Sequence, residues 1–371
     1  MPEIRYVEGH VLYSNPKPHV RSRQAYFPGL VKLPSGDLLA TLMIAEAFES
    51  ADGTTYLSRS KDAGRTWSLE GRLYDAAALP NRMSDCLKPT LLADGSLLAM
   101  GYRFHRDDPE QSISISETGG ILPGQDVVSF STDEGRTWSV PEEISRNRPE
   151  LYELSGPAVQ LRSGDLVAVG ALYKMPDGSN PSGQIGVLLR SVDRGKAWND
   201  GTVFFRTEEG NLTPFEPRLA EMQDGRLVAL VWAYDQATDR HYPNHVVVSE
   251  DGGRTWSEPI DTRVMGQASN LTWLGDDCLL TIHAHRGVEI GICVRIVDFA
   301  RNNWRVLTER VIYGKDVDAQ TRQGQTSAEM FKSLRFGQPS LLPLGDGEFL
   351  AAHWCVEEGQ GKIRLHRLAI T

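Results

Sequence analysis

The chain has 371 residues, with 39 lysines and arginines against 49 aspartates and glutamates, so its formal net charge is −10. Nucleic-acid binding and polybasic membrane tethering both need clustered positive charge, so this balance argues against nucleic-acid and membrane partners. A content of 40% hydrophobic residues is typical of a folded globular protein and argues against a disordered chain.

Targeting segments and cofactor motifs are absent from the sequence pattern. No stretch approaches the ~20 apolar residues of a membrane-spanning helix, and residues 1–10 lack the apolar run of a signal peptide, so we expect a cytoplasmic protein. The four cysteines form no C-x-x-C pair, so we expect neither a zinc site nor a disulfide framework. No glycine-rich phosphate loop or dinucleotide fingerprint occurs, so we expect no cofactor.

Short alternating segments follow one another along the whole chain. The first is an isolated predicted strand at residues 4–13. Six hairpins come next, each consisting of an apolar strand, a tight turn and a second apolar strand, with turns at Gly36, Gly95, Gly164, Gly225, Asp277 and Gly347. Apolar alternation around glycine-containing and aspartate-containing turns is typical of β-hairpins.

One octapeptide, S-x-D-x-G-x-[T/A]-W, follows four of these hairpins. It occupies residues 60–67, 131–138, 191–198 and 249–256, and a worn copy occupies residues 297–304. Each copy lies between two short predicted strands and is therefore interpreted as a turn. The aspartate would accept hydrogen bonds from nearby backbone N–H groups, the glycine would supply a positive φ, and the tryptophan would cover apolar neighbours. Because catalysis does not need four copies of one group, we expect a structural role for these aspartates.

The repeat predicts the architecture. Six units of four strands, recurring about every 60 to 70 residues, predict an all-β, six-bladed β-propeller with four-stranded blades that occupies residues 1–371 as a single domain. The sixth unit is one strand short, because only residues 361–370 remain after its hairpin. We expect the strand at residues 4–13 to complete this blade and close the ring, which removes two exposed edges. Residues 315–335 are long for a connection between blades and suggest a lid or a subunit contact.

The octapeptide, the number of units and the inner hairpins resemble the sialidase (neuraminidase) superfamily, whose octapeptides are called Asp-boxes or BNR repeats. The resemblance covers essentially the whole chain. It implies the propeller fold and, less specifically, a glycosidase site on the face opposite the octapeptides. Sialidases of this family hold the substrate carboxylate with three arginines and use a tyrosine nucleophile paired with a glutamate, together with an aspartate acid/base.

Only part of that family site is present. Glu216, in Glu216-Pro217, matches the catalytic glutamate, and Asp52 is the candidate for the acid/base aspartate. Tyr26 stands where the first arginine is expected, Trp232 where another is expected, and Gln338 where the tyrosine is expected. A sialic acid without its arginine clamp is held poorly, and a glutamate without its tyrosine loses that role, so the pattern departs from that of an ordinary sialidase.

Propeller topology predicts a pocket where the first strand of each blade begins and the second ends. Many ionisable residues fall there, and the wider set includes Glu49, Glu153 and Arg286. The candidate catalytic residues are Glu216, Asp85, Asp235 and His241. The candidate substrate-binding residues are Lys88, Arg103, His105, Arg218, Tyr234, Asn270, His283, His285, Gln338 and His353. His283 and His285 share one strand face, but two histidines at this spacing are weak evidence for a metal, so no metal ligands are assigned.

Three functional hypotheses remain, and all of them have a carbohydrate partner. The leading one is a sialidase-like glycoside hydrolase that releases a terminal sugar, acidic sugars included, with Glu216 paired with Asp85 or Asp235. The second is a lyase acting on a uronate, in which Lys88 and Arg103 neutralise the carboxylate and a histidine or tyrosine takes the proton. The third is a non-catalytic glycan-binding propeller. The oligomeric state is left open.

Overall fold

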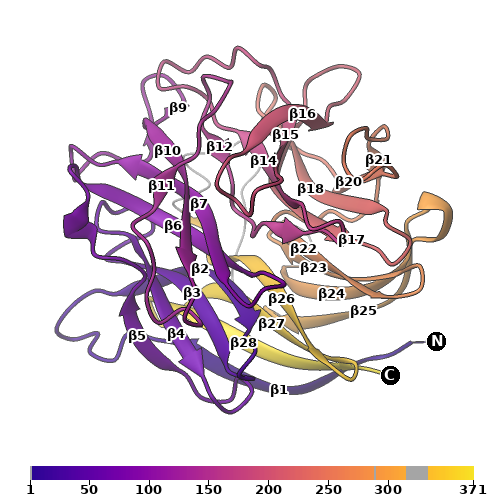
Figure 1. The fold of residues 1–371 in the computed structure, drawn as a ribbon, viewed down its shortest axis with the longest axis horizontal. Coiled ribbons are helices and arrows are strands. Elements are labelled where there is room, and N and C mark those ends of the chain that lie inside the picture. The colour runs from indigo at the N-terminus through magenta and orange to yellow at the C-terminus, as the bar shows by residue number, and fades with distance from the viewer. Residues whose placement is uncertain (1, 288–289, 315–332) are drawn as a thin grey trace.

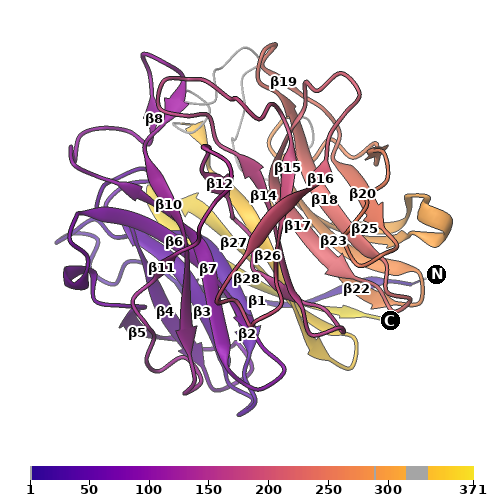
Figure 2. The ribbon, with the colours of Figure 1, turned by 45° about the horizontal axis from the view of Figure 1, so that its top comes forward.

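The computed structural model describes residues 2–287, 290–314 and 333–371, and these residues form six antiparallel sheets around one axis (Figures 1 and 2). Each sheet is one blade of a propeller, with its first strand nearest the axis. The predicted all-β, six-bladed propeller is therefore confirmed. Residues 315–332, most of the segment interpreted as a lid or a subunit contact, lie outside the described residues.

The first three blades follow one another in chain order. Blade 1 contains β2 (Gln24–Lys32), β3 (Leu38–Ala45), β4 (Thr54–Ser60) and β5 (Ser68–Arg72). Blade 2 contains β6 (Met83–Leu91), β7 (Leu97–His105), β10 (Gly124–Ser131) and β11 (Glu142–Glu143), and a small hairpin of β8 (Ser114–Ile115) and β9 (Gly120–Ile121) precedes β10. In blade 3 the inner strand is split into β12 (Tyr152–Glu153) and β13 (Val159–Gln160), which both pair with β14 (Leu166–Leu172), and β15 (Gly186–Ser191) and β16 (Asn199–Phe205) follow.

The last three blades complete the ring. Blade 4 contains β17 (Thr213–Glu221), β18 (Leu227–Asp235), β20 (His245–Ser249) and β21 (Ile260–Asp261), with the short β19 (Arg240–His241) beside β18. Blade 5 contains β22 (Ser269–Gly275), β23 (Cys278–His285), β24 (Gly291–Asp298) and β25 (Arg305–Tyr313). Blade 6 contains β26 (Phe336–Gly345), β27 (Glu348–Glu357), β28 (Gln360–Ile370) and β1 (Ile4–Tyr13). The described residues include two short helical turns, residues 76–78 and 300–302, and no helix in this part of the chain could span a membrane.

The two ends of the chain close the ring, as predicted. Strand β1 pairs antiparallel with β28, from Ile4 opposite Ile370 to Tyr13 opposite Ile363. Glu3 and Thr371 exchange backbone hydrogen bonds of 2.8 and 3.1 Å, so the termini lie side by side (Figure 1). The outer strand of blade 6 is thus supplied by the N-terminus and its other three strands by the C-terminus.

The octapeptides form the turns between the third and fourth strands of their blades. In the first copy, Asp62 Oδ1 accepts hydrogen bonds from the backbone N–H of Thr66 at 2.9 Å and from Ser60 Oγ at 2.8 Å. The Trp67 indole donates to the Gly64 carbonyl at 3.0 Å. Asp133, Asp193 and Asp251 repeat this pattern, and the hydrogen bonds hold the pKa of each aspartate below its usual range. The predicted structural role of these aspartates is confirmed.

The hydrophobic core lies between neighbouring blades. Leu39 of blade 1 and Leu97 of blade 2 belong to one buried cluster, and comparable clusters join each of the other adjacent pairs, including blades 6 and 1. The octapeptide of one blade also contacts the blade before it. At Gly135, with φ of 78°, a Cβ would stand 2.5 Å from Leu39 Cδ2, so the close approach requires glycine. Each blade therefore depends on its neighbours for burial of its apolar faces.

Candidate active site

A pocket enclosing about 1020 Å³, including the part open to solvent, lies on the propeller axis at the face opposite the octapeptide turns. All six blades contribute to its wall. The lining residues come from the starts of first strands, the ends of second strands and nearby loops: Phe27, Met43, Phe48, Glu49, Ser84, Asp85, Cys86, Tyr102, Phe104, Ile113, Ile121, Glu153, Tyr173, Phe215, Glu216, Trp232, Arg286, Leu334, Gln338 and Trp354. The pocket is therefore on the face that the strand topology predicts.

Three pocket residues occupy equivalent backbone bulges in blades 1, 4 and 6. Phe27, Glu216 and Gln338 each precede a proline, and their φ values are 54°, 45° and 40°. The pairing register of the inner strand is interrupted at each of these positions. Positive φ is uncommon for residues other than glycine and costs on the order of 1–3 kcal/mol. Each bulge places one side chain in the pocket, so the local strain coincides with the candidate site.

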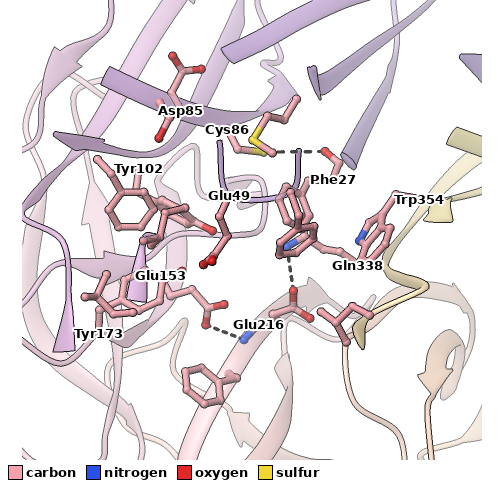
Figure 3. Close-up of a pocket in the computed structure, with 18 of the residues that line it drawn as sticks. Phe27, Glu49, Asp85, Cys86, Tyr102, Glu153, Tyr173, Glu216, Gln338 and Trp354 are labelled. Atoms are coloured by element: carbon pink, nitrogen blue, oxygen red, sulfur yellow. Dashed lines mark hydrogen bonds between the residues drawn. The ribbon is translucent and has the colours of Figure 1, made fainter. Parts of the chain in front are cut away.

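Glutamates from three blades face this pocket. The backbone N–H of Glu216 donates to Glu153 Oε2 at 2.8 Å, which joins blades 4 and 3. Gln338 Nε2 donates to Glu216 Oε1 at 2.9 Å from the other side of the axis. Glu49 comes from the loop after β3, and its side chain approaches the same central space as those of Glu153 and Glu216 (Figure 3). The site therefore brings three carboxyl groups together.

Glu153 and Glu216 have unlike electrostatic surroundings. Burial raises the pKa of Glu153, and the nearby charge of Glu216 raises it further. Buried Lys88, Arg218 and Arg286 all interact electrostatically with Glu216. Burial lowers the pKa of Lys88 to about 8 and that of Arg286 to about 10. Glu153 is thus favoured in its protonated form, while three cations lie close enough to compensate the charge of Glu216.

Aromatic side chains form much of the pocket wall. Phe27 and Phe48 lie 5.3 Å apart in an edge-to-face arrangement, and the Phe48 and Trp354 ring centroids are 5.4 Å apart. Tyr102 and Tyr173 form another edge-to-face pair, at 5.5 Å. Rings of this kind offer flat apolar surfaces on which the C–H face of a sugar can stack.

The sequence is similar to those of two curated proteins. No family model matches the chain. A sialidase from Bacteroides fragilis (strain YCH46) is 26% identical over 252 residues, which cover 64% of this chain and 43% of the relative. The matches cover less than half of the length of the curated relatives.

Solved structures share the fold over nearly the whole chain. A protein of unknown function from Dyadobacter fermentans has a TM-score of 0.75 at 22% identity, covering 99% of both chains. An alpha-L-arabinanase from Penicillium chrysogenum, solved with arabinobiose, has a TM-score of 0.68 at 16% identity and covers 98% of both chains. The chain therefore has the propeller fold of these structures and is similar in sequence to a sialidase.

Of the predicted catalytic residues, Glu216 has its carboxylate at the pocket centre. Asp85 belongs to the wall, but its Oδ1 accepts from the Thr55 backbone N–H at 2.8 Å and its Oδ2 from Tyr74 Oη at 2.6 Å. Its side chain consequently lies apart from the three glutamates (Figure 3). Asp235 is outside the pocket lining, where its Oδ1 accepts from a backbone N–H of the following turn at 2.9 Å. The expected pairing of Glu216 with Asp85 or Asp235 is therefore not formed.

His241 lies behind the pocket wall. Its ring stacks on Trp232, and its Nδ1 accepts from the Trp232 indole at 3.1 Å. Burial lowers the pKa of His241 to about 4. The tryptophan thus stands between this candidate and the pocket, since Trp232 is in the lining and His241 is not.

Among the predicted substrate-binding residues, Gln338 lines the pocket and two cations lie next to it. Lys88 Nζ donates to the Phe27 carbonyl, and Arg218 Nη1 donates to Ser155 Oγ at 3.1 Å. Neither cation is part of the lining. Both are buried, each with one nitrogen on a protein acceptor, and both interact electrostatically with Glu216.

The remaining predicted binding residues lie outside the pocket lining. Four of them have structural partners: Arg103 Nε donates to Gln125 Oε1 at 2.7 Å, Tyr234 Oη to Asp239 Oδ1, and Asn270 Nδ2 to the Pro339 carbonyl at 3.2 Å, while the His105 backbone N–H donates to the Pro123 carbonyl at 2.9 Å. The basic and proton-accepting set proposed for a lyase is therefore not gathered in one place.

The three other candidate histidines are buried within or between blades. Their side-chain contacts are His283 with Asn244 and Thr281, His285 with Arg295, and His353 with His366. These partners occupy the ring nitrogens and hold the imidazoles away from the pocket. In the part of the chain that the structure describes, no group of three or more His, Cys, Asp or Glu side chains is placed to hold a metal ion.

Two carboxyl groups of the site were not selected as candidates, although the wider set of strand-end residues contains them. Glu153 is next to the break between β12 and β13, where the sequence lacks the apolar alternation that predicts a strand. Glu49 lies in the same loop as Asp52, whose Oδ1 instead accepts the Glu46 backbone N–H at 3.0 Å. Glu153 lies four residues ahead of Pro157, whereas Glu216 directly precedes Pro217, so the two glutamates share no local sequence signal.

Proposed function

We propose that this protein is a glycoside hydrolase in which Glu153 donates the proton and Glu216 is the second carboxylate. The observation that carries the proposal is the 2.8 Å hydrogen bond from the Glu216 backbone to Glu153 Oε2, with both side chains in one axial pocket. The names of the sialidase and the arabinanase, both glycosidases, support the same reaction class.

Glycoside hydrolysis needs one carboxyl group that carries a proton and one that does not. Glu153 suits the first role, because burial and the neighbouring Glu216 raise its pKa. As the bond between the anomeric carbon and the glycosidic oxygen breaks, Glu153 gives its proton to that oxygen. Glu216 either attacks the anomeric carbon or removes a proton from the water that attacks it, and in both cases its negative charge is used.

The neighbours of Glu216 support this second role. Gln338 Nε2 donates to one carboxylate oxygen and fixes its orientation, while the other oxygen, Oε2, has no protein partner among the described residues. Lys88, Arg218 and Arg286 interact with the carboxylate electrostatically. The carboxylate is thus oriented by Gln338, while its second oxygen is buried without a protein partner among the described residues.

Turnover of a panel of alkyl glycosides, whose leaving groups need a proton, by Glu153→Gln and Glu216→Gln variants tests the proposal. Each amide retains the size of the side chain and removes its acid–base capacity, so we expect kcat/KM to fall by about 10²- to 10⁴-fold in both. Glu209→Gln is the matched control, because Glu209 is exposed and lies outside the pocket lining. Folded variants that turn over a substrate as fast as the parent would remove the pair from the mechanism.

A further inference from the structure

The inner strand of blade 3 is broken where it carries Glu153. Strand β12 contains only Tyr152 and Glu153, whereas the first strands of the other five blades each have seven to ten residues. In β12 the ladder pairs Tyr152 with Leu172 and Glu153 with Ala171. Because so short a ladder supplies few backbone hydrogen bonds, side-chain contacts must contribute to holding Glu153 in place.

Tyr152, the residue beside Glu153, makes such contacts. Its side chain is fully buried in the cluster between blades 2 and 3. Tyr152 Oη donates to Asp200 Oδ2 on β16 at 2.5 Å, and the Tyr152 backbone N–H donates to Asp126 Oδ2 on β10 at 3.3 Å. This one residue is therefore tied both to the outer strand of its own blade and to the neighbouring blade.

The two acceptor carboxylates are themselves buried and held. Asp200 Oδ2 also accepts the Asn147 backbone N–H at 2.8 Å, and Arg146 Nη1 donates to Asp126 Oδ2 at 3.0 Å. Burial alone would raise the pKa of Asp200, but the hydrogen bonds from Tyr152 and Asn147 hold it below its usual value. An ionised carboxylate is a stronger acceptor than a neutral group, so Asp200 is a firm partner for Tyr152 Oη.

The position of Tyr152 determines that of Glu153. Successive side chains of an extended segment point in opposite directions, so Tyr152 enters the core while Glu153 enters the pocket (Figure 3). There Glu153 Oε2 accepts the Glu216 backbone N–H at 2.8 Å. A displacement of about 1 Å at a reacting group can lower a rate by about 100-fold, so a loosened Tyr152 would carry the carboxyl group out of reach.

We propose that Tyr152 is a positioning residue that holds Glu153 at the glycosidic oxygen, with Asp200 as its partner in that role. The inference rests on the proposed function where catalysis is concerned, because it takes Glu153 as the proton donor. Tyr152 is outside the pocket lining and acts through the backbone that it shares with Glu153. Loss of its contact should therefore impair proton transfer and spare a leaving group that departs without a proton.

Tyr152→Phe tests this inference, because phenylalanine keeps the buried ring and removes Oη. The probes are the methyl and 2,4-dinitrophenyl glycosides of arabinofuranose, galactose, glucose and N-acetylneuraminate, compared for a sugar that the parent hydrolyses. We expect kcat/KM to fall by about 10- to 100-fold on the methyl glycoside and by less than about threefold on the dinitrophenyl glycoside. Equal losses on the two substrates would show a merely structural role and overturn the inference.

Matched variants separate positioning from general destabilisation. Tyr74→Phe removes a similar buried hydrogen bond, from Tyr74 Oη to Asp85 Oδ2 at 2.6 Å, and should change both substrates in equal proportion. Asp200→Asn keeps an oxygen acceptor and should stay within about threefold of the parent, whereas Asp200→Ala should repeat the selective loss. Combining Asp200→Ala with Tyr152→Phe should add nothing, since both remove one contact. A selective loss in Tyr74→Phe, or a further loss in the double variant, would overturn the inference.

A measurement without turnover separates this inference from the proposed function. The Glu216 backbone amide donates to Glu153, so its NMR chemical shift should follow proton release by Glu153, and Glu153→Gln should remove that step. Burial raises the pKa of Glu153, and we expect Tyr152→Phe to move the step toward the ordinary value near 4.3 while Tyr74→Phe leaves it in place. An unmoved step in Tyr152→Phe would overturn the inference. A moved step in a protein that hydrolyses none of the probes would keep the anchoring of Glu153 and remove the proposed function.

Discussion

Gln338 donates a hydrogen bond of 2.9 Å to Glu216 across the propeller axis, although 122 positions separate the two residues in the chain. Both occupy positive φ at equivalent bulges before a proline, one in blade 6 and one in blade 4. The contact therefore depends on how blades 4, 5 and 6 pack around the axis. It ties the orientation of the proposed catalytic carboxylate to the assembly of these three blades.

Loss of the Gln338 amide should lower the chemical rate without unfolding the protein. In Gln338→Met the side chain keeps similar volume but no longer donates to Glu216. We expect kcat to fall by about 10- to 100-fold, as for other residues that orient a reactive group, with KM changed less than threefold and little change in Tm. Steady-state kinetics and thermal melts measure this. An unchanged kcat in the folded variant would show that Glu216 does not depend on Gln338.

The raised pKa of Glu153 should appear in the pH dependence of stability. The unfolded chain releases this proton near pH 4.3, and the folded protein releases it at higher pH. Between the two values the native state binds more protons, so the contribution of Glu153 to stability falls as pH rises. We expect the difference between the Tm of Glu153→Gln and the Tm of the parent to shift in favour of the variant as pH rises above about 4. A difference in Tm that is independent of pH across melts from pH 4 to 9 would contradict the burial argument.

Stacked His353 and His366 should make the closing blade sensitive to acid. The Trp354 carbonyl lies 3.1 Å from His353 Nδ1, so this nitrogen donates and His353 Nε2 accepts the N–H of His366 at 3.0 Å. Nδ1 of His366 then accepts from Tyr6 Oη at 3.3 Å on β1. A further proton on His366 would lie at the nitrogen facing Tyr6, and a further proton on His353 would lie at the nitrogen facing His366. Either proton therefore breaks this series of hydrogen bonds.

Burial lowers the pKa of His353 to about 4 and that of His366 well below its usual value. The stability contributed by a neutral pair is therefore full above the unfolded pKa near 6.5, and it is lost as pH falls toward the folded values. We expect Tm to decline less steeply between pH 7 and 4.5 in His353→Gln and His366→Gln than in the parent. Exposed His19→Gln is the control, and equal slopes in all four proteins would rule out this contribution.

Closure of the ring by β1 should tolerate a change of connectivity but not loss of the strand. Removal of residues 2–13 exposes β28 along its full length, and we expect no cooperative melt above room temperature. A circular permutant that begins at residue 14 and carries residues 3–13 after Thr371 through a two-residue turn should restore the parent Tm within a few degrees. Because Glu3 and Thr371 already form a backbone pair, the new turn requires no rearrangement. A stable truncated protein would show that closure is dispensable.

The fold was predictable because its signals are local. An aspartate that bonds the backbone four residues later, a glycine at positive φ and a tryptophan after it specify the same turn wherever they occur, as at Asp62 and Asp133. Closure by β1 followed from counting strands. Both predictions depend on neighbours in sequence or on the number of units, so they do not require knowledge of the contacts between blades.

Most of the site was not predictable, because its partners come from different blades. Glu216 was recognisable from the Glu-Pro sequence of an inner strand, but its contact with Glu153 depends on the spacing of blades 3 and 4. The rule that selects strand-end residues also fails to say which side of a blade a side chain faces. His283 and His353 fulfil that rule, yet they point between sheets and are fully buried. Aromatic residues such as Tyr102 and Tyr173 line the pocket but carry no charge pattern that singles them out.

The central claim is that Glu153 protonates the leaving group while Glu216 acts at the anomeric carbon, and leaving-group dependence tests it most directly. A dinitrophenyl leaving group departs without a proton, whereas an alkyl leaving group needs one. We predict that Glu153→Gln hydrolyses the dinitrophenyl glycoside with a kcat/KM within about tenfold of that of the parent and no longer hydrolyses the alkyl glycoside. Glu216→Gln should hydrolyse neither substrate. Equal losses on the two substrates in Glu153→Gln, or retained activity in Glu216→Gln, would contradict the assignment.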